Sequence, residues 1–183
     1  MKPKIFSAIF LSIALITSSF ALKPKPVPAT REIAIMAPFQ KITVSEYINV
    51  VLVQDPYRLT ITVTGDEKAV PGVQAKIVKN QLYISSKRSS QGRKITVYVP
   101  VEDISLIELS TGCSISGEGI LKFKDVTVVL SSESHAALNV LGAITIKPGD
   151  DCDFVYEKDE KYKLIPVIIE KKNEQYELIP ASL

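Results

Sequence analysis

The sequence holds few of the residues that metal and nucleotide chemistry require. Its 183 residues include no tryptophan, two cysteines and a single histidine, His135. These are too few ligands for a zinc ribbon or a multi-histidine metal site. Phosphate-cradling glycine loops and dinucleotide fingerprints are absent as well. We therefore expect a packed domain without a metal or a cofactor.

The first 21 residues have the organisation of an export signal. Lys2 and Lys4 precede an apolar run over residues 5–16, and Ser19 and Ala21 are the small residues of a cleavage site. The apolar run is shorter than the roughly 20 residues that span a bilayer. We predict a signal peptide over residues 1–21, cleavage near Ala21 and no transmembrane segment after it. The mature protein is then periplasmic, displayed on the cell surface or secreted.

The mature chain lacks an excess of charge of either sign. The whole sequence carries 22 lysines and arginines against 20 acidic residues, and removal of Lys2 and Lys4 leaves 20 against 20. Nucleic-acid binding depends largely on a positive surface that neutralises phosphates. We therefore expect no nucleic-acid partner.

The residues that are abundant favour strands. Valine, isoleucine and threonine make up 45 of the 162 residues that follow Ala21, whereas alanine makes up 9. β-branched residues prefer strands. Apolar and polar residues alternate in short runs, and Gly65-Asp66, Pro71-Gly72 and Asn80-Gln81 have the composition of turns. The sequence predicts an all-β protein without a convincing helix.

A weak repeat in the second half indicates how the strands pair. Residues 107–110 align with residues 128–131 at an offset of 21, and residues 144–147 form a third run after a shorter step. Such repeats are typical of β-solenoids, in which equivalent apolar side chains of successive coils stack inside. A β-sandwich built from hairpins is the alternative, and the pattern alone favours neither.

Two flanking segments differ from this body, which we place at residues 39–149. Residues 22–38 begin with alternate prolines, which favour an extended tether. Residues 150–183 combine an acidic turn with strand-like runs around a turn at residues 171–174. Because the last coil of a solenoid exposes unpaired backbone groups, we predict a hairpin that packs across this coil and caps it.

The order and spacing of several runs resemble a known family. The runs comprise residues 39–52, 59–67, 80–84, 95–100 and 107–112. Together they resemble the bacterial envelope family called the head GIN domain, or auto-transporter adhesin, over roughly residues 39–146. The resemblance implies an exported, right-handed, single-stranded β-solenoid and brings no catalytic residues. It therefore favours the solenoid over the sandwich.

The sequence departs from the family pattern at two places that affect the fold. Tyr47 stands where the name-giving glycine would be, so this turn either tolerates a side chain or bends differently. Fewer serine-glycine corners follow Gly119 than the family shows, so the solenoid should be short.

Candidate chemistry along the chain is sparse. A nucleophilic triad would need His135 with a serine, yet no nucleophile elbow surrounds the candidate serines, which are Ser110, Ser114, Ser116, Ser131, Ser132 and Ser134. The acidic cluster Asp150, Asp151 and Asp153 lacks the order of a calcium loop. We predict neither catalytic residues nor metal ligands.

The two cysteines are predicted to remain unpaired. A solenoid would place Cys113 and Cys152 about two coils apart, roughly 9 to 10 Å at the usual strand spacing. A disulfide needs Cα atoms within about 7 Å. Cys113 is expected to be a buried apolar filler.

These observations favour a non-enzymatic, adhesin-like binding role toward an envelope glycan, polymer or protein. The candidate contacts are Tyr47, Tyr57, Tyr83 and Tyr98, because aromatic side chains supply contact area at low entropic cost. One alternative is an enzyme acting on envelope polysaccharide, although Glu108 would face Val129 rather than a second carboxylate. Another is a periplasmic structural or sensing accessory. Opposite charges on residues 150–177 and 87–94 could also join copies into a homo-oligomer.

Overall fold

The computed structural model describes residues 28–45, 47–87, 94–156, 167–171 and 174–178. These residues form fifteen strands and one short 3-10 helix, η1 (Val70–Gly72). The all-β prediction is therefore confirmed. No helix within these described ranges has the length and apolarity needed to cross a membrane. The predicted signal peptide lies outside the described residues.

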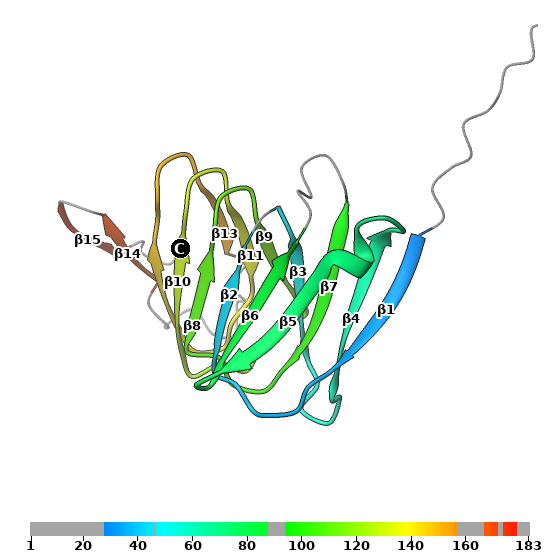
Figure 1. Cartoon of the computed structure of the whole chain (residues 1–183). Helices are drawn as coiled ribbons and strands as arrows, with labels where there is room; N and C mark the ends of the chain where they lie inside the picture. Colours follow the sequence, from blue (N-terminus) through cyan, green and yellow to red (C-terminus); the bar gives the residue numbers. More distant parts are fainter. Residues whose placement is uncertain (1–27, 46, 88–93, 157–166, 172–173, 179–183) are drawn as a thin grey trace, which may run out of the picture.

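The strands form two mixed sheets, which are seen one in front of the other in Figure 1. Sheet A contains, in spatial order, β1 (Pro28–Ala34), β4 (Thr60–Asp66), β7 (Ile95–Val101), β3 (Asn49–Gln54), β9 (Ser114–Glu118), β11 (His135–Leu138) and β13 (Asp153–Tyr156). Sheet B contains, in spatial order, β15 (Glu174–Leu178), β14 (Val167–Lys171), β12 (Ala143–Lys147), β10 (Asp125–Leu130), β8 (Leu106–Leu109), β2 (Lys41–Val44), β6 (Gln81–Ser86) and β5 (Val73–Val78).

From β6 to β13 the chain alternates between the two sheets, and from β8 onward strands one repeat apart are parallel neighbours. Ile107 of β8 lies opposite Val128 of β10, and Leu109 lies opposite Leu130. Val128 in turn lies opposite Ile146 of β12. The pairing predicted from the 21-residue offset is confirmed, and the third run, residues 144–147, pairs with β10 at an offset of 18 residues.

The spatial order of the strands differs from their order in the sequence. Strand β2 is inserted between β6 and β8, and β3 is inserted between β7 and β9, all in parallel register. Antiparallel strands β1, β4 and β5 complete the same end of both sheets. In Figure 1 this end lies at the right, opposite β14 and β15.

The core lies between the sheets and consists of aliphatic columns. Along each strand every second side chain points inward, and the register places these side chains beside their neighbours. One column crosses sheet B through Leu82, Ile42, Ile107, Val128 and Ile146, each at most 1% exposed. Burial of one such side chain is worth about 1.5–3 kcal/mol, so these columns supply most of the stability.

Tyr47 occupies the corner between β2 and β3 in a left-handed conformation, with φ at 54°. This region of backbone space favours glycine, because a side chain there costs about 1–2 kcal/mol. The Tyr47 ring lies over Gly112, where an added Cβ would be 2.3 Å from Cδ1 of the ring. The turn therefore tolerates the Tyr47 side chain, because Gly112 has no side chain and leaves space for the tyrosine ring.

The second half of the expected tether is part of the fold, which corrects that prediction. Residues 28–34 form β1, which pairs antiparallel with β4 from Pro28 opposite Asp66 to Ala34 opposite Thr60. Ala29 and Ile33 pack against the core. Residues 22–27 lie outside the described part of the chain.

The C-terminal strands also differ from the expectation that they pack across the last coil. Strand β14 pairs with β12 in parallel, and β15 pairs with β14 in antiparallel register. They therefore add two strands to sheet B beside β12. Residues 157–166, which include the start of the expected hairpin, lie outside the described residues.

Candidate functional site

The four candidate tyrosines do not share one surface. Tyr83 projects from the outer face of sheet B and is 41% exposed, whereas Tyr98 projects from the outer face of sheet A. Tyr57 lies in the loop after β3 and is 91% exposed. Tyr47 is half-buried against Gly112. A single ligand of ordinary size cannot contact all four.

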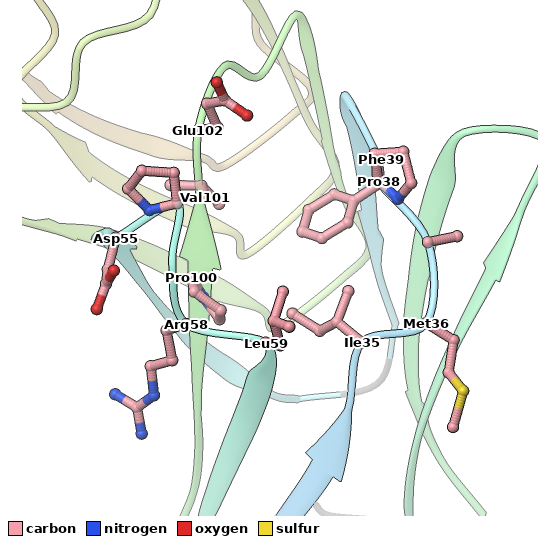
Figure 2. Close-up of a pocket in the computed structure, with 12 residues that line it drawn as sticks. Ile35, Met36, Pro38, Phe39, Asp55, Arg58, Leu59, Pro100, Val101 and Glu102 are labelled. Atoms are coloured by element: carbon pink, nitrogen blue, oxygen red, sulfur yellow. The ribbon is translucent and has the colours of Figure 1, made fainter.

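A groove of about 380 Å³ opens beside the Tyr57 loop. Three segments far apart in the sequence form its walls, as Figure 2 shows. They are the connection from β1 to β2, the connection from β3 to β4, and the end of β7 with the residue that follows it. The lining residues are Ile35, Met36, Ala37, Pro38, Phe39, Asp55, Pro56, Arg58, Leu59, Pro100, Val101 and Glu102.

Each of the three segments carries a proline, and these are Pro38, Pro56 and Pro100. Pro38 and Pro56 lie in the connections, where proline offers no N–H to a strand ladder. Pro100 lies within β7, in register with Val53 of β3. The two connections remain tied to each other, because the Ile35 N–H donates to the Leu59 carbonyl oxygen at 2.7 Å. The groove is therefore held open by the backbone.

The loop after β3 presents its side chains to solvent through a local turn. The Tyr57 N–H donates to Oδ1 of Asp55 at 3.1 Å, which is the geometry of an Asx-turn. The Arg58 guanidinium donates to Oγ1 of Thr62, so it is held along β4. In Figure 2 the charged ends of Asp55, Arg58 and Glu102 point away from the apolar floor.

Exposed apolar side chains gather on the same edge of the molecule. We define this loop edge as the edge at which β3, β7 and β9 end. Met36 is 91% exposed and Leu59 65% exposed. Ile120 belongs to the same edge, because the Lys122 N–H donates to Oε1 of Gln54 at the end of β3. An apolar concentration of this kind on a protein surface is typical of a contact surface.

The only histidine, His135, lies in a row with a serine and an aspartate that the sequence did not reveal. On the outer face of sheet A, His135 of β11 is opposite Ser114 on one side and Asp153 on the other. Within the described residues no hydrogen bond joins the three, and the Ser114 hydroxyl donates instead to Oδ1 of Asn49 at 2.7 Å. A nucleophile needs a hydrogen-bonded base, and this row does not supply one.

The carboxylate of Glu108 is held by neighbours in sheet B. Glu108 lies opposite Val129, and its Oε2 accepts hydrogen bonds from Thr43 at 2.8 Å and from Gln81 at 3.2 Å. The two carboxylates that glycoside hydrolysis commonly requires are not assembled at this position. Across the described ranges there is also no group of three or more histidine, cysteine or acidic side chains that could hold a metal.

Cys113 and Cys152 are not bonded to each other. Cys113 is 1% exposed, as predicted, and Cys152 is half-buried. The His135 N–H donates to the Cys113 carbonyl, and the Asp153 N–H donates to the Ser134 carbonyl. Ser134 therefore lies between the two cysteines, and they are two strand positions apart.

Comparison with solved structures gives several matches of low sequence identity. A "putative adhesin" from Parabacteroides distasonis matches with a TM-score of 0.50 and 15% identity, over 80% of this chain and 66% of that one. A second "putative adhesin", from Parabacteroides merdae, matches with a TM-score of 0.44 and 19% identity, over 66% of this chain and 57% of that one. A "putative lipid binding protein" from P. distasonis matches with a TM-score of 0.34 and 14% identity, over 79% of this chain and 97% of that one.

The comparison with curated proteins gives no match. The family model described as "Putative auto-transporter adhesin, head GIN domain" matches residues 38–147. This match covers more than half of the chain and the strands from β2 to β12. The chain therefore belongs to the head GIN domain family.

Proposed function

We propose that the chain is an exported, non-catalytic binding protein of the cell envelope that holds its partner at the groove on the loop edge. The observation that carries this proposal is the apolar groove of about 380 Å³ with Met36 and Leu59 exposed beside it. Sites of this volume with mostly apolar walls are typical of ligand and partner binding. Membership of an adhesin family supports a binding role.

We further propose that the body of the chain is a short β-solenoid whose coils carry one strand in each sheet. The support is the parallel register that repeats from β6 through β12. In this arrangement the parallel strands of residues 39–149 form the coils, and the antiparallel strands β4 and β5 of the same segment lie at one end of them. Signal cleavage near Ala21 would leave residues 22–27 to link the first strand, β1, to the new N-terminus. The two hydrogen-bonded sheets would hold the loop edge in a fixed position.

The location is tested by protease treatment of whole cells. If the protein is displayed on the cell surface, as an adhesive role requires, we expect external protease to remove the intact band on an immunoblot. A periplasmic marker protein should survive in the same sample. If the band survives in intact cells and disappears only after the outer membrane is opened, the periplasmic accessory role replaces the adhesive one.

Among a glycan, a polymer and a protein, the groove favours a protein. Its floor consists of Ile35, Phe39, Pro100 and Val101, which offer few hydrogen bonds to sugar hydroxyls. An apolar side chain of a partner would instead lose its water shell there, at a gain of about 25 cal/mol per Å² of buried area. Tyr57 is the one candidate tyrosine close enough to this groove to contribute.

Substitution of Leu59 tests the groove directly. We expect the purified wild-type protein to bind isolated outer membranes, and Leu59→Asp to bind at least tenfold more weakly, because burial of a leucine is worth about 1.5–3 kcal/mol. Leu59 is 65% exposed, so the variant should fold normally. Tyr83→Ser on the outer face of sheet B is the matched control and should bind as the wild type does.

Protease treatment of the membranes before the assay distinguishes the classes of partner. A protein partner predicts that binding is lost after this treatment. Binding that survives it and is weakened by Tyr83→Ser but not by Leu59→Asp would contradict the groove and favour a glycan on sheet B. Release of reducing sugar from purified envelope polysaccharide would favour the enzymatic alternative.

A further inference from the structure

We propose a second binding site, at the free edge of β5, that takes an extended acidic peptide as an additional strand of sheet B. The site lies on the other side of the connection from β1 to β2, whose residues Ile35, Met36 and Ala37 line both this cavity and the groove described above. It consists of the outward backbone groups of Ala75 and Ile77 and the cavity beside them. Peptide recognition by strand addition depends on such backbone groups, and side-chain pockets provide its specificity.

The hydrogen-bond alternation shows which groups of β5 face outward. The Lys87 N–H donates to the Gly72 carbonyl at 3.0 Å, in the register that pairs Val73 with Ser86. In an antiparallel pair, alternate residues bond the neighbouring strand. Residues 74, 76 and 78 therefore bond β6, and residues 73, 75 and 77 direct their N–H and C=O groups away from it.

The opposite edge of β6 confirms this assignment independently. The Ser45 N–H donates to the Ile84 carbonyl, and the Gln40 N–H donates to the Asn80 carbonyl. Even-numbered residues of β6 thus face β2, which leaves the odd-numbered residues for β5. Their partners in the register, such as Lys76 opposite Tyr83, are the residues assigned above to the β6 side.

The outward groups at the start of β5 are already occupied within the chain. The Val73 N–H donates to the carbonyl of Val70, the first residue of η1. The Val73 carbonyl accepts a hydrogen bond from the Arg31 guanidinium at 3.2 Å. Within the described ranges sheet B has no strand beyond β5. The outward N–H and C=O groups of Ala75 and Ile77 are therefore the ones that a further strand could pair with.

A cavity of about 250 Å³ lies along this part of the edge. Ala75 and Ile77 form its β5 wall, and the core residues Ile61 and Leu82 form part of its lining. Side chains of a strand paired with β5 would alternate between this cavity and the solvent face. The apolar lining thus selects an aliphatic residue at every second position of the peptide.

The charges around the edge favour acidic residues at the other positions. Lys76 lines the cavity from the edge strand itself, and the exposed Lys79 begins the turn at its end. Arg31 lies at the opposite end of the strand. Glu32 on β1 is the acidic residue nearest to Arg31 in the sequence. A peptide with alternating acidic and aliphatic residues therefore matches this edge in backbone, shape and charge.

Titration with a synthetic peptide tests the site. The probe is an acetylated and amidated hexapeptide in which glutamate and valine alternate, added to the purified full chain. We expect chemical-shift changes and slowed amide hydrogen exchange at Ala75 and Ile77. A peptide methylated on every valine nitrogen should bind at least tenfold more weakly, because the donors directed at β5 are lost.

Edge prolines supply the matched pair of variants. Ala75→Pro removes an outward N–H without touching the bonds to β6, and it should weaken binding of the peptide at least tenfold. Thr30→Pro removes an outward N–H from the edge of β1, because the Ile35 to Leu59 bond places residues 29, 31 and 33 on the β4 side. This variant should bind the peptide as the wild type does.

Three results would overturn the proposal. The first is the absence of binding by the wild-type chain at millimolar peptide. The second is equal binding of the methylated and unmethylated peptides, a comparison that needs no variant to fold. The third is a concentration-dependent dimer of the wild type that Ala75→Pro abolishes, because the occupant would then be a second copy of the chain. Since Leu59→Asp leaves this edge intact, failure at the groove would not affect these measurements.

Discussion

Gly142→Ala is expected to destabilise the protein by about 3 kcal/mol or more, the upper part of the range for overpacking. An ideal Cβ at this position would lie 1.7 Å from the Lys124 carbonyl oxygen and 2.3 Å from that of Phe123. Both contacts are with backbone, and the Lys124 oxygen already accepts the Ala143 N–H at 2.9 Å. The two connections must therefore separate. Urea unfolding followed by circular dichroism measures the loss.

Gly119→Ala is the control for the conformational cost of losing a glycine. Gly119 has a φ of +75°, but no atom lies within 4 Å of its added Cβ. Only the left-handed backbone is penalised, at about 1–2 kcal/mol. If Gly142→Ala destabilises no more than Gly119→Ala, the close stacking of successive connections is contradicted.

Ile107→Ala is expected to lower the free energy of unfolding by about 2–5 kcal/mol. Ile107 is fully buried and lies in register between Ile42 and Val128 in the central column of sheet B. Because neighbours from two strands and from the facing sheet surround the side chain, the column cannot collapse into the space that it leaves. Chemical denaturation at equilibrium provides the measurement.

Ser116→Ala is the matched control on the outer face. Ser116 is half-buried on β9 opposite Val51, and its side chain points away from the core. Its substitution should change stability by no more than about 0.5 kcal/mol. An equal effect of the two substitutions would show that the column through Ile107 is not the main source of stability.

The strands and the direction of their side chains could be read from the sequence, because both depend on local alternation. Ile107 and Leu109 recur as Val128 and Leu130, and the structure pairs them in register. The turn predicted at Asn80-Gln81 lies one residue earlier, at Lys79 and Asn80, which take positive φ values of 48° and 65°. These features depend on residues within a few positions of each other.

The pairing of β1 with β4 was missed because charged residues obscure its alternation. Arg31 lies on the inner face with Ala29 and Ile33, where it donates hydrogen bonds to the carbonyls of Pro71 and Val73. A charged residue between two apolar ones hides the period of two. The prolines before it indicated a tether more strongly than the alternation indicated a strand.

The candidate site was only partly predictable. Of the four tyrosines selected, Tyr57 lies beside the groove, and Tyr83 and Tyr98 lie on opposite outer faces. Pro38, Pro56 and Pro100 each belong to one of the three segments that line the groove. They were visible in the sequence, but nothing in it shows that these three places meet.

The sequence by itself determined that the chain forms short strands with one apolar face, because alternation and β-branching act over neighbouring residues. Only the tertiary structure decided that β2 lies between β6 and β8, which groups of β5 point away from β6 and where the groove opens. The physical reason is that strand partners are selected by the packing of whole columns. Many aliphatic strands satisfy the same local pattern, and only the assembled core distinguishes them.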